Sequence, residues 1–163
     1  MFSFRRYQIG RVYRAERAQA GRFREFYQCD IDTIGSYSSV VDAEFPAIIN
    51  EIFEQFDFGE FTIRINNRKV LNGFFEELGL SAAATDVLRI IDKIEKISRG
   101  DLVAELHDAG CSGEQVARLL EFITIQGEND EILHKLETID INNEQFQTGA
   151  RELHDVLTAL RAM

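Results

Sequence analysis

Between residues 14 and 32 the sequence reads Arg14-Ala-Glu16-Arg-Ala-Gln-Ala-Gly21-Arg22-Phe-Arg-Glu-Phe26-Tyr-Gln28-Cys-Asp-Ile-Asp32. The residues on either side of its centre, 6–14 and 25–34, are rich in β-branched and aromatic types and partly alternate, which is typical of strands. The segment 18–21 between them is short, with small and polar residues. The stretch therefore predicts an antiparallel hairpin with a long, mobile tip, around which the rest of the fold is arranged.

One face of the second predicted strand is polar. Side chains two residues apart in a strand share a face, so Phe26, Gln28, Asp30 and Asp32 line one surface of the sheet. Polar groups in the middle of an apolar sheet are costly to bury unless a ligand or a hydrogen-bond network satisfies them. This row therefore predicts a binding surface.

The arginines around the hairpin suggest what that surface binds. Arg14, Arg22 and Arg24 carry forked guanidinium groups that can bind phosphate oxygens in a geometry that lysine cannot reproduce. Phe26 offers a flat apolar ring on which a nucleotide base could stack. In the alternative interpretation, the arginines pair with the many carboxylates of the chain on a solvated surface, and composition alone leaves both open.

The stretch resembles motif 2 of the class II aminoacyl-tRNA synthetases, in which an arginine and a glutamate on one strand precede a variable loop and a phenylalanine on the next strand. Within that class, residues 14–32 are similar to the histidyl-tRNA synthetase family in order and spacing. The similarity continues through Asp42-Ala-Glu44, Ile63–Arg68 and Leu71-Asn72-Gly73 and is weaker in the second half of the chain.

The resemblance implies an ATP site in the hairpin. Arg14 would contact the α-phosphate and stabilise the charge that develops at phosphorus, which makes it the catalytic residue of the set. Glu16 would meet the adenine edge, Arg22 would hold the γ-phosphate, and Phe26 would stack on the adenine. Mg²⁺ would enter as part of the ATP complex.

The resemblance also implies a histidine site beside the nucleotide. Gln28 and Asp32 would recognise the substrate histidine, and Arg14 would contact its carboxyl end. The family joins histidine to ATP as an adenylate and transfers it to tRNA(His), as a cytoplasmic homodimer without a membrane anchor. Adenylyl transfer depends mostly on positioning and charge stabilisation, so it needs no protein nucleophile.

Several family segments have no counterpart in the 163 residues. These are motif 1, which forms the dimer interface, the glutamate and threonine segment, an Arg-Gly-Leu-Asp-Tyr-Tyr type segment and the glycine-rich motif 3. The sequence also has Ala18 where the family usually has proline. We therefore expect a fragment of a histidine-tRNA ligase that is inactive alone.

Two other functions stay open at this point. The chain could resemble the synthetase-like regulatory subunit of ATP phosphoribosyltransferase, which senses histidine without catalysis. The intact set of Arg14, Glu16, Arg22 and Phe26 favours the ligase, because a histidine sensor needs no residues for ATP phosphates. A purely structural helical protein would leave the arginine-rich hairpin unexplained.

Composition narrows the class of protein. An apolar content of 45% supports an ordinary core, no stretch approaches the roughly 18 apolar residues of a membrane span, and two cysteines suit a reducing cytoplasm. The net charge of −10 is uneven, since residues 1–24 hold seven arginines and one acid, or +6, which leaves −16 for the remainder. That acidic remainder disfavours direct RNA binding there, and Lys93, Lys96 and Arg99 read as a solvated face.

The remaining chain reads mostly as helices. Apolar residues three and four apart predict a helix from about residue 40 to 56, followed by a third strand over 61–66 and a helix over 68–77 capped by Asn67. After Ser81 only short capped helices are expected: one whose apolar spacing runs from Val87 to Ile97, one that begins at Asp101, and one that begins with a capping box over residues 112–115. No histidine spacing predicts a metal site. The sequence thus predicts an α+β fold, with an antiparallel sheet and flanking helices in a partial catalytic core (1–80) and a small all-α insertion domain (81–163), which in the family approaches the tRNA acceptor stem.

Overall fold

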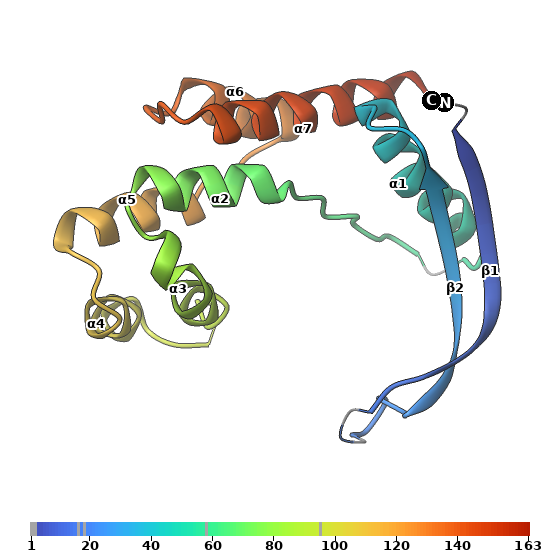
Figure 1. Cartoon of the computed structure of the whole chain (residues 1–163), viewed down its shortest axis with the longest axis horizontal. Helices are drawn as coiled ribbons and strands as arrows, with labels where there is room; N and C mark the ends of the chain where they lie inside the picture. Colours follow the sequence, from blue (N-terminus) through green and yellow to red (C-terminus); the bar gives the residue numbers. More distant parts are fainter. Residues whose placement is uncertain (1–2, 16, 18, 58, 95) are drawn as a thin grey trace. The chain divides into compact units, whose positions relative to one another are not determined.

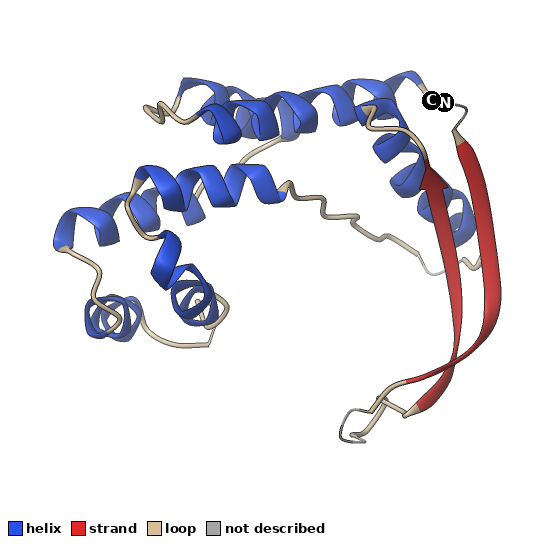
Figure 2. Cartoon of the chain, in the orientation of Figure 1, coloured by secondary structure: helices blue, strands red, loops and turns tan. Residues whose placement is uncertain are grey.

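The computed structural model covers the whole chain, and it describes residues 3–15, 17, 19–57, 59–94 and 96–163. The described residues form one two-stranded antiparallel sheet and a series of helices, so the chain belongs to the α+β class as predicted (Figures 1 and 2). The elements in chain order are β1 (Phe4–Tyr13), β2 (Glu25–Ile34), α1 (Ser39–Gln55), α2 (Arg68–Glu77), the 3₁₀ turn η1 (Ser81–Ala83), α3 (Ala84–Ile91), α4 (Arg99–Asp108), α5 (Gly113–Ile123), α6 (Asn129–Thr138) and α7 (Glu144–Ala162).

The chain divides into two compact units. Unit 1 contains residues 1–63 and 156–163, and unit 2 contains residues 64–155. Helix α2 therefore groups in space with the helices that follow Ser81. These units are defined by how compactly their residues cluster in space, whereas the predicted boundary marks where an inserted domain begins in the sequence. The division into 1–80 and 81–163 therefore stays a prediction.

Unit 1 is built on the hairpin. The ten residues of β1 pair with the ten residues of β2, from Phe4 opposite Ile34 to Tyr13 opposite Glu25. Helix α1 lies against one face of this hairpin, where both strands and α1 line a largely apolar cavity of about 340 Å³. Tyr7, Tyr13 and Tyr27 on that face stay 77%, 70% and 69% exposed, so α1 covers it only in part.

An ion pair joins the hairpin to α1. Arg5 Nε donates to Glu44 Oε2 at 2.6 Å, and Arg5 Nη2 donates to the other oxygen of the same carboxylate. The hydrogen bond from Arg5 lowers the pKa of Glu44, although partial desolvation of the carboxyl opposes this. Both oxygens of the carboxylate are thus bound by one guanidinium, a forked contact between the first strand and α1.

The predicted third strand is wrong. Residues 61–66 are not a strand, and the sheet of the described residues has two strands. The alternation behind the prediction is real at its start, because Phe61 and Ile63 are half-buried and Thr62 is exposed. Phe61 packs edge-to-face on Phe53 of α1, with 5.3 Å between ring centroids, so packing on a helix produces the same period as packing in a sheet.

Unit 2 contains the main hydrophobic core. Its buried cluster runs from Val70 of α2 to Ala150 of α7, and Phe74 of α2 stacks on Phe122 of α5 with ring centroids 4.1 Å apart. The backbones of α2 and α7 approach closely at two glycines, Gly73 of α2 and Gly149 of α7. A Cβ added to Gly149 would lie 2.7 Å from the Val70 backbone nitrogen.

Capping residues set the ends of these helices. Asn67 caps α2 by accepting from the Lys69 backbone N–H at 2.8 Å, as predicted. Ser112 and Gln115 form the predicted capping box of α5, and the Gln115 side chain also donates to the Leu78 carbonyl at 2.7 Å. Helix α4 begins at Arg99 with Ser98 as its cap, two residues before the predicted start at Asp101.

Candidate functional site

The register of the hairpin gathers the predicted binding residues on one face. Arg6 lies opposite Asp32, Gly10 opposite Gln28, and Val12 opposite Phe26. This is the face away from the α1 cavity, because residues of odd number, such as Tyr7 and Ile31, line that cavity. We call the row Phe26, Gln28, Asp30 and Asp32, together with Arg14 beyond the end of β1, the polar face of the hairpin.

Arg14 is held beside two of the predicted ligand residues. Its backbone N–H donates to the Arg24 carbonyl at 2.8 Å, which continues the pairing beyond β1. Its guanidinium carbon lies 4.6 Å from the centroid of the Phe26 ring, and its Nη2 donates to Gln28 Oε1 at 3.3 Å. Cation, ring and amide therefore lie together on this face.

The row continues through Asp30. The Gln28 side chain, with its Oε1 accepting from Arg14, donates from Nε2 to Asp30 Oδ1. Phe26, Gln28 and Asp30 are all half-buried, and Arg14 is exposed. The polar side chains that the sequence predicts to be costly to bury on this face thus form hydrogen bonds with one another and stay partly exposed to solvent.

Asp32 is held by an arginine of the other strand. Arg6 Nε donates to Asp32 Oδ2 at 2.8 Å, with the two side chains 49% and 44% exposed. An ion pair at this exposure is worth at most about 1 kcal/mol, so a ligand ammonium group can compete for the Asp32 carboxylate.

The remaining predicted residues belong to the loop. Gln19 and Arg22 form an isolated bridge, with N–H to carbonyl distances of 3.2 and 2.9 Å, and Gly21 between them has φ of +76°. Arg22 is exposed near the tip of the hairpin, and Glu16 lies outside the described residues. Arg14, Phe26 and Gln28 are thus brought into contact, Asp32 lies on their face, and Arg22 is in the loop.

The polar face has open space opposite Gln28. The cross-strand residue there is Gly10, and a Cβ added to it would meet no atom within 4 Å. A side chain would fill this strip, so Gly10 leaves the surface of the sheet accessible between Phe26 and Asp30.

Sequence reasoning left two partners on this face unassigned. The period of two places Asp30 in the polar row but assigns it no role, and the strand pattern predicts Arg6 only as a strand residue. The signal for Arg6 is its position opposite Asp32, which follows from the register once the hairpin ends at Tyr13 and Glu25.

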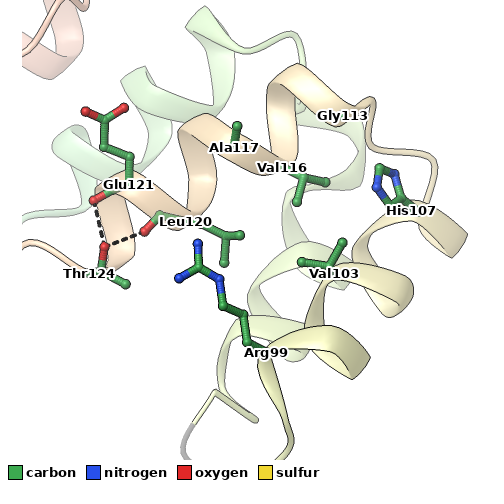
Figure 3. Close-up of a pocket in the computed structure, with 9 residues that line it drawn as sticks. All are labelled: Arg99, Val103, His107, Gly113, Val116, Ala117, Leu120, Glu121 and Thr124. Atoms are coloured by element: carbon green, nitrogen blue, oxygen red, sulfur yellow. Dashed lines mark hydrogen bonds between the residues drawn. The ribbon is translucent and has the colours of Figure 1, made fainter.

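A separate hollow lies in unit 2 between α4 and α5 (Figure 3). It has a volume of about 370 Å³ and an apolar wall that includes Val103 and Leu120, and Figure 3 shows Arg99 extending from α4 toward α5. All of its lining residues fall between 99 and 124, so it contains none of the predicted ATP or histidine residues. Among the described residues, no group of three histidine, cysteine or acidic side chains could hold a metal ion. No described helix is long and apolar enough to span a bilayer.

The comparisons with known proteins agree with one another. A family model described as Histidyl-tRNA synthetase matches residues 3–163. The chain is 48% identical to a histidine-tRNA ligase of Clostridium tetani (strain Massachusetts / E88), over 99% of this chain and 37% of that protein. It is 45% identical to a histidine-tRNA ligase of Nostoc punctiforme, over 99% of this chain and 36% of that protein.

The structure is similar to a solved one. The crystal structure of histidyl-tRNA synthetase from Nostoc sp. PCC 7120 superposes with a TM-score of 0.88 at 42% sequence identity, over 99% of this chain and 38% of that chain. The chain therefore spans somewhat more than a third of the length of the relatives it matches. The resemblance carried by residues 14–32 is confirmed by comparison of both sequence and structure.

Proposed function

The chain belongs to the histidyl-tRNA synthetase family, and from that membership we propose that its hairpin is part of the site in which a histidine-tRNA ligase activates histidine with ATP. The observation that carries this proposal is the contact of Arg14 with both Phe26 and Gln28 on one accessible face. The regulatory alternative is not favoured, since these relatives are named as ligases.

In the proposed nucleotide complex, adenine stacks on Phe26 and Glu16 meets the adenine edge. Arg14 then leaves the ring and binds the α-phosphate, while Arg22 binds the γ-phosphate. Arg14 gains more than it loses in this change of partner. The exposed cation–π contact that it gives up contributes about 0.5–1 kcal/mol, whereas a hydrogen bond to a charged group such as phosphate contributes about 1.5–3 kcal/mol. Mg²⁺ enters with ATP and neutralises charge on the phosphates.

In the proposed reaction, a carboxylate oxygen of histidine attacks the α-phosphorus, and the bond from phosphorus to the bridging oxygen breaks to release pyrophosphate. Arg14 lies where it can stabilise charge at that phosphorus. Gln28 and Asp32 hold the histidine. The ribose hydroxyl of tRNA(His) then takes the histidyl group from the adenylate and releases AMP.

The rest of this proposal concerns the whole protein. The ligase would act as a cytoplasmic homodimer, with residues 81–163 as the inserted module near the tRNA acceptor stem. We expect the 163-residue chain itself to bind ATP weakly and not to catalyse, because the Arg-Gly-Leu-Asp-Tyr-Tyr type segment and motif 3 are not among its residues.

Calorimetric titration of the chain with Mg²⁺-ATP, with and without histidine, tests this function. We expect Arg14→Ala to weaken binding of both ATP and tripolyphosphate about tenfold, or about 1.4 kcal/mol. Phe26→Ala should weaken binding of ATP only, because tripolyphosphate has no base to stack.

Arg11→Ala is the matched control. Arg11 lies in β1, three residues before Arg14 and on the opposite face, where it pairs with Glu25 at 3.1 Å and its guanidinium carbon lies 5.7 Å from the Tyr27 ring centroid. It removes the same charge from the hairpin and should change ATP binding less than twofold. Equal weakening by Arg11→Ala and Arg14→Ala would mean that ATP responds to general positive charge, and the proposed site would be wrong.

A further inference from the structure

Gln28 lies between two neighbours that require the same orientation of its amide. Asp30 faces the Nε2 end of the side chain, and Arg14 faces the Oε1 end. An ionised carboxylate only accepts hydrogen bonds and a guanidinium only donates them. A reversed amide would place oxygen against carboxylate and NH₂ against guanidinium, so both contacts would become repulsive.

The two constraints do not persist equally when a nucleotide binds. In the proposed complex Arg14 moves to the α-phosphate and no longer faces Gln28. Asp30 is on the same strand and face as Gln28, two residues further along, and it does not need to move. Gly10 opposite Gln28 has no side chain that could hold the amide instead.

We propose that Asp30 is a positioning residue that fixes the amide of Gln28 with its oxygen presented as an acceptor to the amino acid. This inference rests on the proposed function for the identity of the ligand. The chemical class it selects is a ligand that carries an N–H donor at this position, such as the ammonium or imidazole N–H of histidine. A ligand group that only accepts would meet an oxygen and be rejected.

Glutamine side-chain NMR signals of the ¹⁵N-labelled chain test the orientation without any ligand, with the Gln28 signals identified by their loss in Gln28→Met. In the wild-type chain we expect the Nε2 protons of Gln28 to be widely separated in shift and to exchange slowly with water, because one of them is bound to Asp30. In Asp30→Asn they should move towards the values of exposed glutamines, because a neutral amide oxygen is a weaker acceptor than a carboxylate and the amide can also turn its NH₂ towards Gln28.

Glu25→Gln is the matched control. It makes the same change of carboxylate to amide in the same strand, but on the face that carries Arg11. The Gln28 signals should not move in this variant. Unchanged Gln28 signals in Asp30→Asn would overturn the proposal.

Histidine binding separates positioning from simple charge. We expect Asp30→Asn to lower the affinity for histidine at least fivefold and to change the affinity for tripolyphosphate by less than twofold. The double variant Q28E/D30N has the net charge of the wild-type chain. Its carboxylate at position 28 presents an oxygen to the ligand in either orientation and needs no partner to fix it, so the variant should recover histidine binding. Histidine binding that stays weak in the double variant would show that Asp30 acts on the ligand directly and would overturn the role assigned to it.

Two further outcomes are informative. If Asp30→Asn loses the folded-state signals of the strand residues Tyr7 and Ile31, the variant Asp30→Glu takes its place. Glutamate also only accepts hydrogen bonds, so the Nε2 protons of Gln28 should still exchange slowly with water. Fast exchange of these protons in Asp30→Glu would contradict the proposal. If the wild-type chain binds neither ATP nor histidine, the proposed function fails, and the Gln28 signals still decide whether Asp30 fixes the amide.

Discussion

Arg5, Arg6 and Arg11 lie in the first strand and Arg14 directly follows it, yet each has a different partner. Strand geometry assigns their faces from sequence alone, because alternate side chains point to opposite sides. Their partners depend on cross-strand register and on rotamers, which sequence spacing does not specify. The sequence therefore predicted Arg14 and Phe26 as members of one site but gave no sign that the guanidinium rests on the ring.

The ion pair of Arg5 and Glu44 gives a pH prediction. Because the pKa of Glu44 is lower in the folded chain than in the unfolded chain, the unfolded chain takes up the proton first as the pH falls. The stabilisation by this pair is therefore complete above the ordinary glutamate pKa of about 4.3 and is lost as the pH falls through the folded value. A ¹³C NMR titration of the Glu44 carboxyl should give a midpoint below the ordinary range.

Arg5→Gln should raise that midpoint to the ordinary range, because the main cause of the shift is removed. Arg11→Gln breaks the pair with Glu25 instead and should leave Glu44 unchanged. A midpoint that does not respond to Arg5→Gln would show that the pair does not persist in solution.

At the scale of elements, the close approach of α2 and α7 gives a prediction for stability. A methyl group at Gly149 would lie 2.7 Å from the Val70 nitrogen and 2.9 Å from Lys69 Cβ, and neither atom is at the end of a flexible side chain. Overpacking of this kind costs about 1–3 kcal/mol, which exceeds the gain of up to about 1 kcal/mol from replacing a helical glycine. Gly149→Ala should therefore lower the free energy of unfolding measured in urea.

Gly100→Ala is the control for this helix substitution. Gly100 lies in the first turn of α4, and a Cβ there would meet only Ser98 Oγ, at 3.7 Å. This variant should gain up to about 1 kcal/mol of stability. An unchanged or higher stability of Gly149→Ala would show that the two helices do not approach as closely as described.

Helix ends were easier to predict than strand pairing. Asn67 and Ser112 cap helices with side chains that act on the next turn, so three or four residues of sequence contain the whole signal. Residues 61–66 alternate like a strand, but the backbone groups of a strand also need a partner strand to bond with. Whether such a partner is present depends on residues far away in the sequence. The sequence also misses the end of α3, which lies at Ile91 although the apolar spacing continues to Ile97.

At the scale of the whole molecule, the two units differ in the amount of core that each contains. The buried cluster lies within residues 70–150, whereas most of β1 is exposed. A two-stranded hairpin is only marginally stable by itself. Hydrogen exchange followed by mass spectrometry should therefore give exchange at least about 100-fold faster for residues 4–13 and 25–34 than for 70–77 and 116–120. Equal protection in these four segments would show a single cooperative unit.

The placement of the tyrosines determines which part of this chain a spectroscopist can see. All four of them, Tyr7, Tyr13, Tyr27 and Tyr37, fall in unit 1, and the sequence contains no tryptophan. Tyrosine fluorescence therefore reports on unit 1 alone, while the circular dichroism of the peptide backbone is dominated by the helices of unit 2. Melting curves recorded with the two signals read separate halves of the molecule without any added label, and the temperature difference between them measures how tightly those halves are coupled.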